Sequence, residues 1–137
     1  MSTTCVVPIS VGELIDKITI LSIKVKHCQG ARLNHVIQEL AALEQVHASN
    51  DLAIEANLIE QLQRVNQMLW NVEDSLRKHE QLQDFGQEFV RLARSVYQLN
   101  DRRAAIKYQI NVQNKSALIE EKVYGDADTP IRVGTAS

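Results

Sequence analysis

Apolar residues recur at steps of three and four along most of this chain, and this spacing predicts amphipathic helices. Four such segments are expected, at about residues 11–28, 32–48, 52–82 and 87–112. The second is expected to turn these apolar residues toward a core: Leu33, Val36, Ile37, Leu40, Leu43 and Val46. The third carries a seam typical of coiled coils: Leu58, Leu62, Val65, Leu69, Val72 and Leu76.

Boundary signals separate these segments. Ser10 and Glu13 have the spacing of a capping box, and Gly30 is a typical stop after the first helix. The turn-forming residues 84–86 stand between the last two segments. Because short connections between long helices favour antiparallel neighbours, we predict an all-α, antiparallel up-down helical bundle whose last two helices form a long hairpin.

The two ends of the chain are expected to be less regular. Pro8 limits the residues before the first helix to a short extended segment. A short helix is expected over residues 117–124, followed by a polar tail that frays. We therefore assign residues 1–124 to a single helical-bundle domain and residues 125–137 to a flexible tail.

The composition of the 137 residues narrows the functional class. A net charge of −2 gives no electrostatic case for nucleic acid or for an anionic membrane. Two cysteines are too few for a disulfide framework, and no segment reaches the roughly 18 apolar residues that a membrane span needs. We expect a cytoplasmic protein that does not bind nucleic acid or insert into a membrane.

One charged residue stands at a core position of the last helix. Val96, Leu99, Ile106 and Ile110 recur at helical spacing, and Arg103 occupies the inward position between them. A buried unpaired charge costs several kcal/mol, so this guanidinium must meet a carboxylate or a bound anion. The candidate carboxylates are Glu13, Asp16, Glu73 and Asp74.

Polar stripes beside the apolar seams extend this observation to three helices. Their members are Glu13, Asp16, Lys17 and Lys24; Asn66, Trp70, Glu73 and Arg77; and Asn100, Arg103, Lys107 and Asn111. One interpretation is an internal ion-pair network that fixes how the helices pack. The other is an anion-binding pocket built from Lys17, Arg103 and Lys107, with Tyr97 and Asn100 as orienting donors, because arginine binds carboxylate or phosphate with two bonds at once.

Motifs for other chemistries are missing. The four histidines are scattered and never stand at a metal-ligand spacing, and Glu13-x-x-Asp16 has no second carboxylate pair to complete a metal site. No glycine-rich phosphate loop or nucleophile elbow is present. We expect no metal and no cofactor.

The first helix also raises the question of a second subunit. Ile20 and Ile23 lie nearly opposite its main apolar stripe, so this helix is apolar on two sides. Either another helix or a second copy of the chain must cover that side. We expect a homo-oligomer.

Four stretches resemble an uncharacterised bacterial family of small helical proteins, which is classed as a domain of unknown function: VGELIDKITILSIK (11–24), VNQMLWNVEDSLRKHE (65–80), DFGQEFVRLARSVYQLNDRRAAIKYQIN (84–111) and EEKVY (120–124). The resemblance implies an accessory role, because members of that family occur near, or fused to, glycosyltransferase-type proteins of surface-polysaccharide assembly. It implies no catalytic residue.

Two functional hypotheses follow. The first is a non-catalytic, oligomeric helical protein that binds a protein partner or an anionic small molecule. The second is a small all-α enzyme that holds an anionic substrate through Lys17, Arg103 and Lys107, with Glu13 or Glu73 as acid or base. The candidate ligand-binding residues are Glu13, Asp16, Lys17, Trp70, Glu73, Arg77, Tyr97, Asn100, Arg103 and Lys107.

Overall fold

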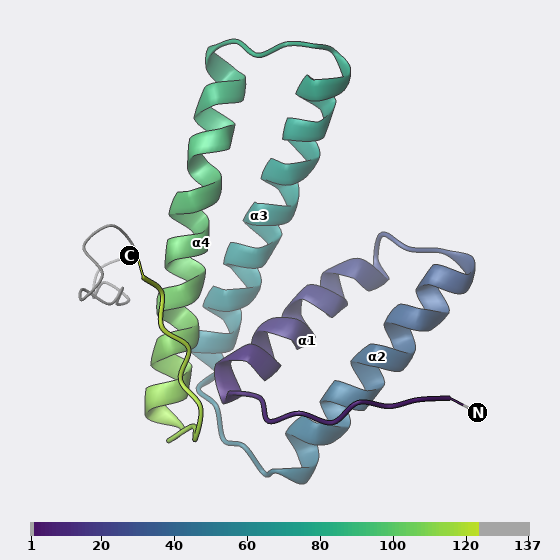
Figure 1. The fold of residues 1–137 in the computed structure, drawn as a ribbon, viewed down its shortest axis with the longest axis vertical. Coiled ribbons are helices and arrows are strands. Elements are labelled where there is room, and N and C mark those ends of the chain that lie inside the picture. Colours follow the sequence, from purple (N-terminus) through teal and green to yellow (C-terminus); the bar gives the residue numbers. More distant parts are fainter. Residues whose placement is uncertain (1, 124–137) are drawn as a thin grey trace.

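The computed structural model describes residues 2–123, and within them the regular structure is entirely helical (Figure 1). The helices are α1 (Val11–Val25), α2 (Gly30–Ser49), α3 (Ala56–Gln81) and α4 (Gln87–Gln113). The all-α prediction is confirmed, and each helix falls on one of the expected segments. None of the helices in this part of the chain is long and apolar enough to cross a membrane.

Two helix boundaries differ from those expected, and one expected helix is absent. Helix α1 ends at Val25 rather than near residue 28, and α3 begins at Ala56 rather than near residue 52. The link before α3 is not helical, because Asp51 adopts a left-handed φ of 50° and Ile54 then packs against the core. The short helix expected from residue 117 is absent from the described residues up to 123, which follow an irregular path along α4. The tail expected from residue 125 lies outside the described residues.

The helices form two antiparallel hairpins that share a base and diverge from it (Figure 1). The α3–α4 hairpin is the longer, and its turn lies far from the other hairpin. Helix α1 packs against all three other helices, whereas α2 packs against α1 alone. Helix α1 is therefore the helix that joins α2 to the α3–α4 hairpin.

The apolar core lies where α1, α3 and α4 meet. Its buried members are Ile15, Leu58, Leu62, Val65, Ile106 and Ile110. Helix α2 contributes no buried residue, and Ile37 and Val46 are 47% and 38% exposed. The expectation that these two residues face a core is wrong, because α2 has only one helical neighbour and its apolar stripe is wider than that contact.

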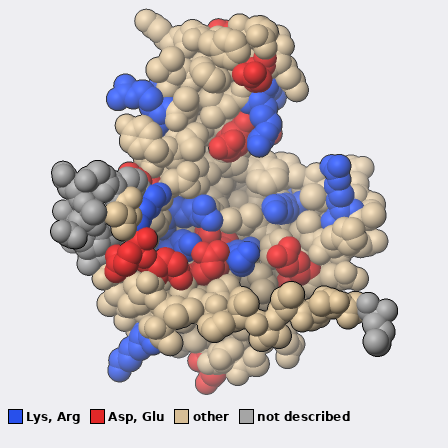
Figure 2. Space-filling view, in the orientation of Figure 1, with Lys and Arg blue, Asp and Glu red and all other residues tan. Residues whose placement is uncertain are grey.

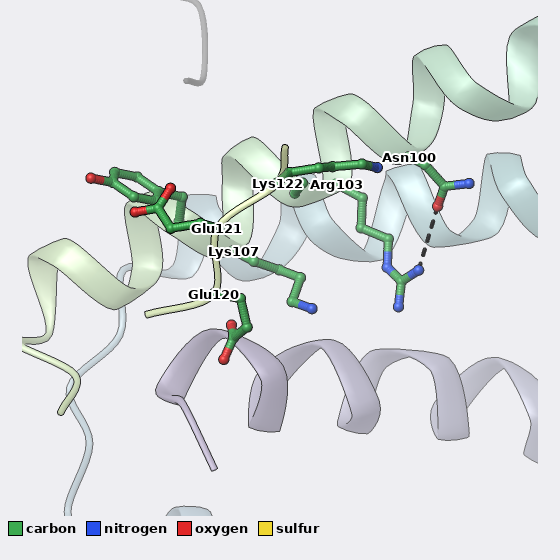
Figure 3. A pocket seen from close by; sticks show the side chains of 8 residues that line it. Asn100, Arg103, Lys107, Glu120, Glu121 and Lys122 are labelled. Carbon is green, nitrogen blue, oxygen red and sulfur yellow. Dashed lines mark hydrogen bonds between the residues drawn. The ribbon is translucent and has the colours of Figure 1, made fainter. Parts of the chain in front are cut away.

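The first turn of α1 approaches α4 unusually closely. A Cβ atom on Gly12 would lie 2.6 Å from the backbone oxygen of Lys107, closer than real side chains come to a carbonyl. Only glycine therefore fits at position 12 without a steric clash. Its lack of a side chain lets the polar face of α1 reach α4, where Arg103 and Lys107 extend toward it (Figure 3).

We predict that Gly12→Ala lowers the free energy of unfolding by about 2 kcal/mol, because the clash is with backbone and outweighs the better helix propensity of alanine. Urea unfolding followed by circular dichroism measures the change. Gly86→Ala is the control: Gly86 has a φ of −74°, and its added Cβ meets nothing closer than 3.4 Å. Equal losses in the two variants would contradict the close approach of α1 to α4.

Candidate functional site

Side chains from distant parts of the chain satisfy the free amides at the start of α1. Ser10 has extended backbone, and its Oγ accepts a hydrogen bond from the third amide of the helix at 3.0 Å. The amide of Val11 donates to Ser116 Oγ at 3.1 Å, and that of Gly12 donates to Asn111 Oδ1 at 2.6 Å. The N-cap predicted at Ser10 is confirmed, and two further groups complete it.

Residues 116–123, which we call the strap, continue this attachment. Glu120 Oε1 accepts hydrogen bonds from Ser10 Oγ at 2.7 Å and from Asn111 Nδ2 at 3.3 Å. A carboxylate beside the positive end of a helix is favourable electrostatically. The strap therefore ties the first turn of α1 to the last turns of α4.

Asp16 is the buried centre of the polar network. Its side chain is fully buried, and its Oδ1 accepts hydrogen bonds from Arg103 Nε and from Asn66 Nδ2, each at 2.9 Å. Its Oδ2 accepts a second bond from Arg103, through Nη2. Asp16 thus joins α1 to both α3 and α4, and it is the carboxylate, among the four expected, that pairs with Arg103.

The Arg103 guanidinium is held on one edge only. The hydrogen bonds that Arg103 donates to Asp16 raise the pKa of the guanidinium, although partial burial opposes this, so the group stays charged at neutral pH. Its Nη1 points toward Asn100 Oδ1 at 3.5 Å, the long limit of a hydrogen bond. The side chain is 28% exposed, so the outer edge reaches the surface.

A second ion pair lies one helical turn along α4. Lys107 Nζ pairs with Glu13 and also lies 3.8 Å from Asp16 Oδ2. Glu13 therefore does not close the capping box with Ser10, because its carboxylate turns to α4 instead. Acidic and basic side chains alternate in a band across the middle of the molecule, where the hairpins meet (Figure 2).

Arg103 lines three clefts. The largest, about 460 Å³, lies between α1, α3 and α4 and also contains Asn66 and Asn100. Its apolar wall consists of Ile20, Ile23, Leu69 and Trp70, and its charged rim consists of Glu73, Asp74 and Arg77. We call this space the hairpin cleft.

The two smaller clefts lie on either side of the α1–α4 contact. One, of about 220 Å³, separates α4 from the strap and contains Asn100, Lys107 and Glu120 (Figure 3). The other, of about 200 Å³, is bordered by α1 and by Glu39 of α2. Arg103 stands where the three meet.

The structure divides the ten sequence-predicted site residues among these clefts. Trp70, Glu73, Arg77, Asn100 and Arg103 line the hairpin cleft. Glu13, Asp16 and Lys17 line the cleft beside α2, and Lys107 lines the cleft beside the strap. Tyr97 is 55% exposed and lines none of the three.

Two expectations change as a result. Lys17, Arg103 and Lys107 share no cleft among these three, so the pocket does not take the form first expected. Ile23 is only 3% exposed within the single chain, so no second copy is needed to cover it.

Other members of the network were missed from the sequence. Thr19, Ser116 and Glu120 join it through hydrogen bonds. Ser116 and Glu120 lie beyond α4, and helical periodicity says nothing about where such residues pack. Thr19 stands near Asp16 on α1, but a threonine at that spacing is too common to be a signal.

The chain belongs to DUF6165, a family of unknown function, which it matches over residues 5–137. The family supplies no activity for the site. Searches of curated proteins and of solved structures found no significant match. The function must therefore be argued from the geometry.

We predict that Arg103→Met destabilises the protein by about 3 kcal/mol, because it leaves the fully buried Asp16 without its main partner. Asp16→Leu should cost less, since Arg103 is partly exposed and can turn to solvent. The double variant should be more stable than Arg103→Met alone. Urea unfolding of all four proteins measures this cycle, and full additivity of the single losses would show that the pair is not coupled.

Proposed function

We propose that this protein binds an anionic small molecule in the hairpin cleft, with Arg103 as the anion-binding residue. The observation that carries this proposal is the one-sided attachment of the guanidinium. Asp16 occupies Nε and one hydrogen of Nη2, and Nη1 makes only the long contact with Asn100. Other N–H groups of the guanidinium are therefore available beside the clefts that Arg103 lines. That outer edge matches a carboxylate or phosphate with two parallel hydrogen bonds.

The internal ion pair supports this role. A guanidinium that awaits a ligand alone in a protein interior is costly, and it samples many orientations because its side chain is long. The ion pair with Asp16 offsets the cost of the buried charge and restricts the orientations that the side chain adopts. Arg103 is therefore pre-oriented, so an incoming anion loses less conformational entropy on binding.

The arrangement favours binding over catalysis. An enzyme that holds its substrate through Lys17, Arg103 and Lys107 needs all three cations in one cleft, but Arg103 shares one cleft with Lys107 and a different one with Lys17. Glu13 pairs with Lys107, and Glu73 lies 3.8 Å from Arg77 on the surface of α3. We therefore propose a non-catalytic binding protein.

The proposal also includes the oligomeric state, the cellular location and an accessory role of the protein. The exposed apolar residues Ile37 and Val46 of α2 support a homo-oligomer, which the molar mass in solution tests directly. A cytoplasmic location has its support in the small number of cysteines, and an accessory role in bacterial surface-polysaccharide assembly has its support in the sequence resemblance alone.

We predict that an anionic metabolite raises the melting temperature of the wild-type protein and not that of Arg103→Lys. Lysine keeps the charge beside Asp16 but lacks a second edge for the ligand. The screen uses dicarboxylates, inorganic phosphate and nucleotide sugars, each with and without magnesium. A ligand at 100 times its Kd stabilises the folded state by about 2.7 kcal/mol.

Arg64→Lys is the matched control, since Arg64 is an exposed arginine of α3 paired with Glu60 away from the cleft. It should leave the ligand-induced shift unchanged. A shift that survives in Arg103→Lys, or a panel without any binder, would contradict the proposed function.

A further inference from the structure

The indole N–H of Trp70 is a buried donor without a hydrogen-bond partner. Among the buried side-chain nitrogen and oxygen atoms of the described residues, it is the one left unmet. Trp70 lines the hairpin cleft and neither of the two smaller clefts. A buried polar group without a partner costs free energy, and native proteins keep few of them. This N–H therefore needs an acceptor that the described residues do not supply.

The ring stacked on Trp70 is not that acceptor. His27 lies in the turn after α1, with its ring centroid 4.6 Å from that of Trp70 and an interplanar angle of 26°. The indole N–H and the imidazole lone pair each lie in the plane of their own ring, so between two stacked rings the donor does not point at the acceptor. An acceptor must approach from another direction, and the hairpin cleft is the space that Trp70 lines.

This approach requires a small movement of the indole. Its nitrogen is buried in the free protein, so an oxygen atom reaches it only when the ring turns toward the cleft. His27 is exposed, and one stacked aromatic pair adds only modest stability, so the ring turns at small cost. A buried donor has no hydrogen bond with water to lose, so a ligand that reaches it gains the bond in full.

The position of this donor relative to Arg103 sets the shape of the ligand. Asn66 Nδ2 and Arg103 Nε each lie 2.9 Å from the same oxygen of Asp16, so Arg103 meets α3 beside Asn66. Trp70 stands one helical turn further along α3, about 6 Å along the helix axis. A ligand whose anionic group occupies Arg103 therefore reaches Trp70 with a second group, a few bonds away.

A carbonyl oxygen suits this second position. The indole N–H only donates, so its partner must accept. A carbonyl oxygen needs one donor, whereas a hydroxyl group brings a hydrogen of its own. The apolar wall of the cleft, with Ile20, Ile23 and Leu69, offers that hydrogen no acceptor and suits a hydrocarbon chain instead.

We propose that the ligand of the hairpin cleft is an oxo acid, an aliphatic carboxylate whose chain carries a carbonyl group a few carbons from its charged end. The carboxylate binds Arg103, and the carbonyl oxygen accepts the indole N–H of Trp70. The chain packs against Ile20 and Leu69. This inference rests on the proposed anion-binding role of Arg103 and specifies the class of molecule bound.

The test is isothermal titration calorimetry with 4-oxopentanoate and 5-oxohexanoate, each compared with its analogue that lacks the carbonyl, pentanoate and hexanoate. We expect at least one oxo acid to bind about fivefold more tightly than its analogue, the effect of one hydrogen bond to an unmet buried donor. Apolar packing alone gives the opposite order, because the carbonyl group must leave water. Oxo acids that bind no more tightly than their analogues in both pairs would overturn the inference.

Two variants separate the N–H from the ring that carries it. Trp70→Phe keeps an aromatic ring without the N–H, so it should abolish the preference for the oxo acid and leave the affinity for the analogue nearly unchanged. His27→Ala removes the stacked ring and keeps the N–H, so it should retain the preference. A preference that persists in Trp70→Phe would contradict the assigned donor.

The wild-type protein gives a second measurement that needs no variant. The chain contains one tryptophan, so one indole signal is expected in a proton–nitrogen NMR spectrum. The oxo acid should shift the indole proton downfield, as a new hydrogen bond does, and the analogue should shift it less. Equal shifts with the two ligands would contradict a bond between the carbonyl and Trp70.

The outcomes separate this inference from the proposed function. If the acids of each pair bind through Arg103 with equal affinity, or if only other anions of the screen bind, the oxo-acid inference is wrong and the anion-binding role stands. If neither these acids nor any anion of the screen binds, both are wrong. Binding of an oxo acid that is lost in Arg103→Lys, and that falls to the level of its analogue in Trp70→Phe, supports both.

Discussion

The fully buried carboxylate of Asp16 is the constraint on which the packing of α1, α3 and α4 depends. A lone carboxylate in a protein interior is too costly to keep, so donors must reach it from the neighbouring helices. Arg103 does so from α4 and Asn66 from α3, and the three side chains fix the helices relative to one another. Gly12 serves the same end, because only a residue without a side chain lets α1 approach α4 closely enough.

In the function that we propose, this constraint also prepares a binding site. An ion-pair network and an anion-binding pocket first look like competing explanations of Arg103, yet one guanidinium has two edges and can serve both. Asp16 holds the inner edge, and Nη1 on the other side lies 3.5 Å from Asn100 Oδ1, on a residue that also lines the hairpin cleft. The structural pair removes the flexibility that would otherwise weaken ligand binding, so stability and recognition share one residue.

Helical periodicity predicted the four helices and the inward position of Arg103, because burial of one helix face imposes that period. It also predicted that Arg103 meets a carboxylate or a bound anion, but it could not say which. The sequence of one helix sets the face on which a residue lies, whereas a contact depends on how two helices cross. The same limit explains Ile37, which has the spacing of a core residue on a helix with a single helical neighbour. Glu120 was beyond prediction, since the strap is not helical and has no period.

The most direct test is a nitrogen-15 NMR spectrum of protein labelled at arginine, which observes the guanidinium of Arg103 itself. The account predicts that its Nε–H exchanges slowly with water at neutral pH, because that proton is held by a buried carboxylate. Addition of an anion that raises the melting temperature should then shift the Nη signals and leave the Nε–H protected. Rapid exchange of Nε–H in the free protein would contradict the buried pair, and unmoved Nη signals at a saturating concentration of that anion would contradict the role of the outer edge.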